Sequence, residues 1–74
     1  MPIKISDHHM HLEINSQIIA TAIEDDQGWW EVTHWPRFFR RSEAITALTV
    51  TELLATGHDS DDPVVTVLRA ELLP

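Results

Sequence analysis

The sequence predicts an α+β fold in which a small antiparallel meander of two or three strands is followed by two C-terminal helices. Near the N-terminus, apolar and polar residues alternate as they do in a half-buried strand. A turn sequence at residues 25–28 separates two segments rich in β-forming residues. Later in the chain, apolar residues recur at helical spacing instead. A chain of 74 residues has room for one domain, which we take to be residues 1–74.

The first strand is predicted in the histidine-rich segment near the N-terminus. Met10, Leu12 and Ile14 alternate there with polar residues, which places the three apolar side chains on one face. The two isoleucines that precede this segment have the opposite parity. A single strand that carries both sets on one face therefore needs a bulge or a break near residues 6–8.

A β-hairpin is predicted from two segments and the turn between them. Residues 17–24 are rich in Ile, Ala and Thr, and residues 29–35 are rich in aromatic and β-branched side chains. Residues 25–28 have the composition of a turn, because Gly28 can adopt the left-handed backbone that a short loop often requires.

The second strand of this hairpin carries aromatic rings on both faces. Alternation places Trp30 and Val32 on one face and Trp29, Glu31 and Trp35 on the other. A domain this small cannot bury both faces equally. We therefore expect Trp30, Val32 and one phenylalanine to join the core, and the other rings to be partly covered by arginine stems or exposed for binding.

Pro36 ends this strand because it has no backbone N–H to donate, and residues 37–41 are predicted to form a connector. Ser42 is the predicted N-cap of the first helix. Glu43 then lies in the first turn, where the helix dipole favours a negative charge. Gly57 supplies the stop expected just after a helix C-terminus.

The first helix has one broad apolar face, with two apolar residues outside it. On a helical wheel the face holds Ala44, Ile45, Ala47, Leu48, Leu54 and Ala55. Val50 and Leu53 fall outside it, so either they meet a second surface or the helix is buried on more than one side.

The second helix is predicted to begin at Asp62-Pro63. Aspartate caps helices, and proline is tolerated at the first helical position, where its missing N–H has no partner to lose. The apolar residues that follow recur at helical spacing on one face. They are Val64, Val65, Leu68 and Leu72.

Charge and cysteine content limit the environment and the partners of the chain. Twelve acidic residues against five basic ones give a formal charge of −7, which disfavours nonspecific attraction to nucleic acid or to anionic membranes. The chain has no cysteine, which fits a reducing compartment. Its start lacks the long apolar run of a signal peptide or membrane span. We therefore expect a cytoplasmic protein that does not enter the membrane.

A metal site at the histidines is possible from residue types alone. On a regular strand, His9, His11 and Glu13 project from the same face and offer the imidazole and carboxylate groups that bind zinc. A complete site needs further convergent ligands and a second shell. We favour the alternative that these are polar residues on the solvent face of an edge strand, and we expect neither metal nor cofactor.

No motif of a catalytic site is present in the sequence. It has no glycine-rich phosphate loop, no nucleophile elbow and no cysteine nucleophile. The acidic run at residues 59–62 lacks the central glycine and terminal glutamate of a calcium loop, so helix capping explains it better. We expect no catalytic residues and predict that the chain is not an enzyme.

All five aromatic residues and three of the five basic residues lie in one short stretch, residues 29–41. Trp, Phe and Arg side chains together are typical of interaction hot spots, because they bring large contact area and forked hydrogen-bond donors. The candidate partner-binding residues are Trp29, Trp35, Arg37, Phe38, Phe39, Arg40 and Arg41.

The composition favours a protein-interaction or self-associating module, and we expect a homodimer or a complex with another protein. Twofold pairing is the commonest way to bury an excess of apolar surface. One alternative is nucleic-acid binding through Arg37, Arg40 and Arg41 with aromatic stacking, which the net charge disfavours. The other is acidic mimicry of nucleic acid, in which the chain occupies a basic site on a host protein.

Residues 29–73 resemble small uncharacterised proteins of actinobacteria and their phages. The similar features are a Trp-containing strand, an "AITAL" helix that contains Ala44-Ile45-Thr46-Ala47-Leu48, and a second helix that starts with an acidic-Pro pair. The resemblance implies a host or phage accessory protein and carries over no catalytic residue.

Overall fold

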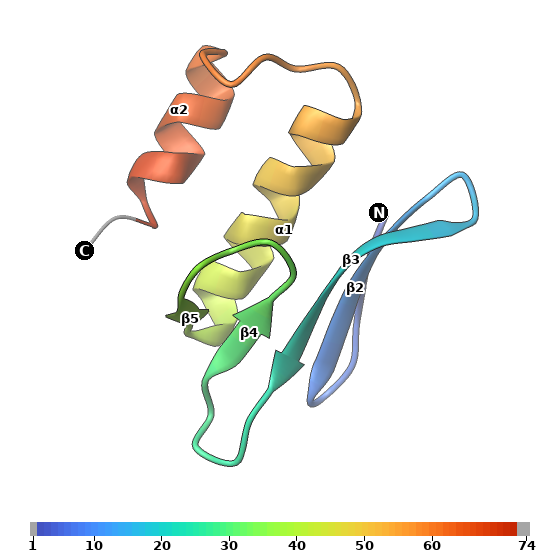
Figure 1. The fold of residues 1–74 in the computed structure, drawn as a ribbon, viewed down its shortest axis with the longest axis vertical. Helices are drawn as coiled ribbons and strands as arrows, with labels where there is room; N and C mark the ends of the chain where they lie inside the picture. The colour runs from blue at the N-terminus through green and yellow to red at the C-terminus, as the bar shows by residue number, and fades with distance from the viewer. Residues whose placement is uncertain (1, 73–74) are drawn as a thin grey trace.

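The computed structural model describes residues 2–72 and contains five antiparallel strands and two helices (Figure 1). In chain order the elements are β1 (Ile3–Ile5), β2 (His9–Ile14), β3 (Gln17–Glu24), β4 (Trp30–Val32), β5 (Phe38–Phe39), α1 (Arg41–Ala55) and α2 (Pro63–Ala70). The strands lie in the sheet in the same order as in the sequence. The predicted α+β meander with two C-terminal helices is therefore confirmed, with more strands than the two or three expected.

The extra strand at the N-terminus explains the change of parity in the sequence. β1 pairs with β2 so that Ile3 lies opposite Leu12 and Ile5 lies opposite Met10. The chain reverses between the two strands, where the Ser6 N–H donates to the His9 carbonyl at 2.7 Å. The break predicted near residues 6–8 is thus a turn, and the two apolar sets belong to two strands.

The β2–β3 hairpin turns tightly and contains a register shift. Asn15 and Ser16 have φ values of 53° and 66°, as expected for a two-residue turn between antiparallel strands. Leu12 lies opposite Ala20, whereas Glu13 lies opposite Ile18, so β3 has one extra residue at this point. The turn contains no glycine, and a turn at this position was not predicted from the sequence.

The β3–β4 turn confirms the predicted hairpin at residues 25–28. The Asp25 carboxylate accepts hydrogen bonds from the Gln27 N–H at 2.8 Å and the Trp29 N–H at 3.0 Å. Gly28 has a φ of 84°, in the region that glycine adopts without strain. The turn is therefore fixed by local residues alone.

β4 is shorter than predicted, and this changes the position of Trp35. The strand ends at Val32, and the following loop includes His34, whose φ is 68°. The chain then returns as β5, with Phe39 opposite Trp30. The predicted connector at residues 37–41 therefore contains a strand. Alternation cannot be extended through a loop, so the prediction that Trp35 shares the face of Trp29 is wrong.

Helix α1 begins at Arg41, and its N-cap is Arg40 rather than the predicted Ser42. The Glu43 carboxylate accepts a hydrogen bond from the Arg40 N–H at 2.9 Å. Ser42 lies inside the helix, where its carbonyl accepts from the Thr46 hydroxyl at 3.2 Å. Because β5 ends at Phe39, the chain is already free to enter the helix at Arg41, one residue before Ser42.

Helix α1 packs against both the sheet and α2, and its side chains are buried against each of them. Its fully buried residues are Ala44, Ala47, Leu48 and Val50. Val50 is thus part of the interior, while Leu54 is 37% exposed and Ala55 is exposed, contrary to the predicted apolar face. A helix with two neighbours buries more than one stripe, which was the alternative left open for Val50.

Helix α2 starts as predicted and packs against α1. The Asp62 carboxylate accepts a hydrogen bond from the Val64 N–H at 2.9 Å, and Pro63 is the first helical residue. Val65 is completely buried, but Val64 is 54% exposed, so only part of the predicted apolar face is covered. No helix among residues 2–72 is long and apolar enough to cross a membrane.

The core lies between α1 and one face of the sheet. In Figure 1, α1 lies behind β4 and β5, and α2 lies beside α1. Sheet residues of one parity are buried against the helix, including Met10, Leu12, Trp30, Val32 and Phe39. Ala20 and Ala22 contribute small side chains to the same face, which lets α1 approach β3 closely. Among residues 2–72, no helix covers the other face of the sheet.

His8 joins the β1–β2 turn to the end of β3. Its Nδ1 lies 2.5 Å from the Glu24 Oε1, and the Glu24 N–H donates to the His8 carbonyl at 3.1 Å. The hydrogen bond to the Glu24 carboxylate, together with the negative charge of that group, raises the pKa of the His8 imidazole above its ordinary value. The protonated ring therefore stabilises this corner of the sheet.

We expect the contribution of His8 to stability to depend on pH in a defined direction. Because the folded-state pKa is raised, the contribution is complete below about pH 6.5 and is lost as pH rises through the raised value. Melting temperatures of the wild type and of His8→Gln, compared from about pH 5.5 to about pH 8.5, should differ at the acidic end and converge at the alkaline end. A difference that grows with pH would contradict the pairing.

Candidate protein-interaction surface

We call the face of the sheet opposite α1 the outer face. It carries polar, charged and exposed apolar side chains. Its residues are Lys4, His9, His11, Glu13, Ile18, Thr21, Ile23, Glu31 and Phe38, with Asp25, Trp29 and Arg40 at its rim. Cross-strand partners share a face of a sheet, and their side chains are direct neighbours. The strand register therefore determines which of these residues touch.

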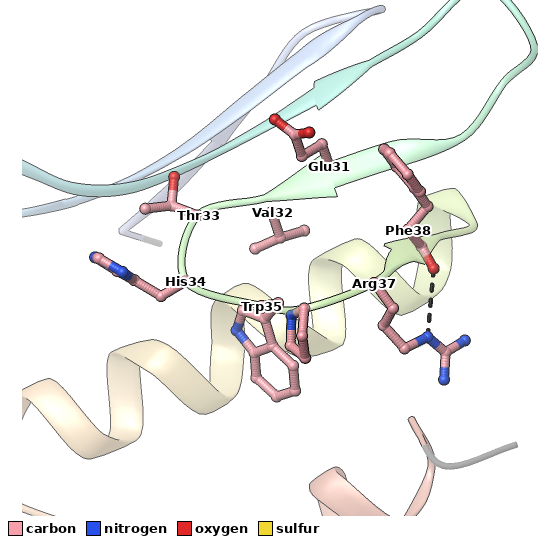
Figure 2. Close-up of a pocket in the computed structure, with 8 residues that line it drawn as sticks. Glu31, Val32, Thr33, His34, Trp35, Arg37 and Phe38 are labelled. Carbon is pink, nitrogen blue, oxygen red and sulfur yellow. Dashed lines mark hydrogen bonds between the residues drawn. The ribbon is translucent and has the colours of Figure 1, made fainter.

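A central row of four side chains crosses the outer face from β2 to β5. It consists of His9, Ile23, Glu31 and Phe38, each opposite the next in the strand register. Ile23 is 55% exposed and Phe38 is 52% exposed. Figure 2 shows Glu31 and Phe38 on the side of β4 and β5 away from α1, while Val32 points toward the helix. The row thus presents two large apolar groups to solvent, with a carboxylate between them.

A second row beside it is polar. Lys4 on β1 lies opposite His11 on β2, which lies opposite Thr21 on β3. The Thr21 hydroxyl is 3.0 Å from the hydroxyl of Thr33, so the polar row ends in a hydrogen-bonded pair just beyond β4. One side of the central row is therefore polar.

A cation–π pair lies on the other side of the central row. The Arg40 guanidinium lies 4.9 Å from the centre of the Trp29 ring. Trp29 is 37% exposed, so part of the ring remains accessible next to the stacked arginine. Both residues belong to the predicted partner-binding set, and together with Phe38 they are the members of that set that the outer face brings together.

The other two arginines of the predicted set bind within the chain. The Arg41 guanidinium lies 5.5 Å from the centre of the Trp30 ring and donates to the Asp7 carbonyl at 3.2 Å. Arg37 stacks on Phe39 at 4.9 Å and donates to the carbonyl of Leu72. Each arginine of the cluster thus stacks on one aromatic ring, and these contacts hold separate elements of the fold together.

Phe39 and Trp35 lie on the helix side of the sheet, away from the outer face. Phe39 is completely buried, so its predicted role in partner binding is wrong for the folded chain, and its place is in the core. Trp35 is half-buried against that core and meets Phe39 edge to face at 5.6 Å. Its indole N–H donates to the Thr51 hydroxyl on α1 at 3.4 Å. Both rings are used to attach the β4–β5 loop to α1.

Sequence reasoning missed Ile23 as a surface residue. The signal was present, because Ala20 and Ala22 alternate with Thr21 and Ile23 in the segment 17–24. Small residues of one parity indicate the face that a helix approaches, and the larger residues then point to the other side. Applied to β3, this rule places Ile23 on the outer face.

The histidines lie together but do not form a complete metal site. His9 and His11 have ring centres 5.6 Å apart, and the His11 Nε2 lies 3.5 Å from the Glu13 Oε2. The three side chains therefore share the outer face, as the alternation predicted. Within residues 2–72, no group of three or more His, Cys, Asp or Glu side chains is arranged so that it could hold a metal ion.

A pocket of about 340 Å³ adjoins the outer face at the β4–β5 loop. It is lined by residues 31–38, and Figure 2 shows the loop curving around it, with Glu31 and Phe38 at one side and Trp35 at the other. The pocket is open to solvent and lies next to the exposed ring of Phe38. It continues the exposed surface of the central row toward the loop.

No family model, curated protein or solved structure matches this chain. The resemblance of residues 29–73 to small actinobacterial and phage proteins therefore stays a prediction. The three features on which it depends fall on β4, α1 and the start of α2.

Proposed function

We propose that this chain is a small protein-binding module and that the outer face is its binding surface. The observation that supports the proposal is the exposure of Ile23 and Phe38, each by more than half, in one cross-strand row. The free face of an antiparallel sheet usually carries polar side chains, because it faces water. Large apolar groups grouped on such a face usually mark an interaction site.

The alternative of nucleic-acid binding has weaker support, because the arginines that would contact phosphate have partners within the chain. Arg37 stacks on Phe39, Arg41 stacks on Trp30, and both donate hydrogen bonds to backbone carbonyls. Arg40 and Lys4 are the cationic residues at the outer face, and the carboxylates of Glu13, Glu31 and Asp25 offset them. The acidic-mimic alternative requires a row of carboxylates spaced like phosphates on one surface, and these three are interspersed with cationic and apolar side chains.

We infer cytoplasmic residence from the absence of cysteine in the sequence, and an accessory role in a bacterial host or phage from the resemblance of residues 29–73. A binding module without catalytic residues fits both inferences. We propose no enzymatic activity, because the sequence holds no motif of a catalytic site.

Photo-crosslinking from the outer face tests the proposed function. A photoreactive amino acid at Ile23 should give discrete protein adducts when the chain is expressed in its native cells. The same amino acid at Val67, which is 60% exposed on α2, is the matched control and should give far fewer. Separation on a denaturing gel and mass spectrometry identify what is attached.

Two outcomes would contradict the proposal. Adducts that form from Val67 and not from Ile23 would place the binding surface on α2. Adducts that are digested by nuclease and not by protease would favour the nucleic-acid alternative instead.

A further inference from the structure

The outer face differs from the rest of the molecule in its charge. Three of the twelve acidic residues, Glu13, Asp25 and Glu31, and two of the five basic residues, Lys4 and Arg40, lie on it or at its rim. The face therefore carries a net charge of −1, and most of the formal charge of −7 lies on the other surfaces. A basic partner would be attracted to those other surfaces, and an acidic partner would be repelled by them.

These observations identify the kind of partner that fits the face. We propose that the partner of the outer face is a second copy of this chain, packed face to face in a twofold dimer; this inference rests on the proposed function. Two chains with a charge of −7 repel each other least when they meet through the surface that carries little of that charge. A face that holds both signs of charge around the exposed side chains of Ile23 and Phe38 can also pair with itself, as a twofold interface must.

The order of the strands selects the twofold axis. β3 is the central strand of the five, so an axis that runs along β3 superimposes the whole face of one copy on that of the other. Ile23 then faces Ile23 of the second copy, and His9 on β2 faces Glu31 of the second copy on β4. An axis across the strands instead stacks each strand on its own copy and sets Glu31 against Glu31, which like-charge repulsion disfavours.

The size of the face sets the expected affinity. The five strands have two to eight residues each. At about 4.8 Å between strands and about 3.3 Å per residue, they give a face of roughly 350 Å² per copy. Side chains add to the area of a flat sheet, so the two copies together would bury on the order of 1,000 Å² of accessible surface. This area is at the lower limit of specific interfaces. We therefore expect a dimer that forms at micromolar concentration and dissociates on dilution.

Sedimentation velocity over a concentration series measures the association. The wild type should move from one chain to two as concentration rises. Ile23→Asp and Phe38→Asp should each weaken the association at least tenfold, because each puts a desolvated charge in the interface. Val67→Asp should leave it unchanged, although Val67 is as exposed as Ile23. Circular dichroism of each variant confirms that the fold is intact.

Cysteine cross-linking tests the axis, and the chain is suited to it because it contains no cysteine. Facing sheets lie about 10 Å apart, which is too far for a disulfide but within reach of a short bismaleimide. Ile23→Cys should cross-link to itself, and Val67→Cys should not. Glu31→Cys should link poorly to itself, since the two sites lie about 14 Å apart in the proposed arrangement. It should link efficiently to His9→Cys when the two proteins are mixed.

The results separate the dimer from the proposed function. A mass of one chain at every concentration, together with protein adducts from the photoreactive residue at Ile23, would overturn the dimer and leave the outer face as a site for another protein. A dimer that Val67→Asp disrupts and Ile23→Asp does not would overturn both. Efficient self-linking of Glu31→Cys would overturn the axis along β3.

Discussion

Replacing Phe39 with alanine should leave most of the chain unfolded at room temperature, whereas the same change at Phe38 should leave it folded. The two residues are neighbours on β5, but Phe39 is completely buried and Phe38 is 52% exposed. Removing a buried phenylalanine costs about 3–5 kcal/mol. A domain of this size without disulfides has a total stability of about 3–5 kcal/mol, so the loss removes most of it.

Urea unfolding followed by circular dichroism measures the effect. Phe38→Ala should shift the midpoint only slightly, since it removes a ring that is half in solvent. It should nevertheless weaken the association proposed for the outer face. If Phe39→Ala unfolded with the midpoint of the wild type and lost only partner binding, Phe39 would be a binding residue after all, as the sequence suggested, and its place in the core would be wrong.

The features that the sequence predicted correctly depend on a few neighbouring residues. Asp25 and Gly28 form the β3–β4 turn through hydrogen bonds and a backbone angle within that turn. Asp62 caps α2 with its own carboxylate, and Gly57, with a φ of 101°, ends α1. None of these features depends on what is packed against it, so sequence reasoning could identify them.

The strand number could not be predicted because a change of parity has two physical explanations. The switch between Ile5 and Met10 fits a bulge within one strand or a turn between two, and only pairing across the sheet decides between them. β5 consists of Phe38 and Phe39, which is too short to show a period. Its existence depends on β4 as a partner, and this is not visible in residues 37–41.

The candidate site was only partly predictable for the same reason. The sequence showed that the rings and arginines cluster in residues 29–41, but not which ring faces α1 and which faces solvent. That division follows from the pairing of β4 with β5 and from the loop at His34, which turns Trp35 toward the helix. Ile23 joins the surface from outside the cluster, through the register of β3 with β4.

Arg37 and Arg40 differ in how many contacts they make within the fold, so their substitution should affect stability to different extents. Arg37 contacts three parts of the fold: it donates to the Phe38 carbonyl at 3.3 Å and to the Leu72 carbonyl, and it lies 3.7 Å from the Glu43 carboxylate. Arg40 has its stacking contact with Trp29. The two residues therefore form a matched pair, one inside a network of contacts and the other at the rim of the outer face.

We expect Arg37→Ala to destabilise the chain by about 1–2 kcal/mol, a value reduced from that of a buried charged group because the side chain is 38% exposed. Arg40→Ala should cost less than about 0.5 kcal/mol, as exposed substitutions usually do. Arg37→Lys should recover little, since an ammonium cannot reproduce the planar fork. Chemical unfolding of the three variants beside the wild type measures these differences.

Alanine variants at Arg37, Arg40 and Arg41 separate the structural role of the arginines from nucleic-acid binding. If the cluster contacted phosphates, the affinity for duplex DNA would fall at each of Arg37, Arg40 and Arg41, and each loss would reduce the slope of log affinity against log salt by about 1. The contacts within the chain predict instead that stability falls more at Arg37 and Arg41 than at Arg40, and that no variant changes a salt-dependent affinity. Equal effects of all three on DNA binding, with unchanged unfolding midpoints, would overturn the assignment of Arg37 to the fold and favour a phosphate-binding surface.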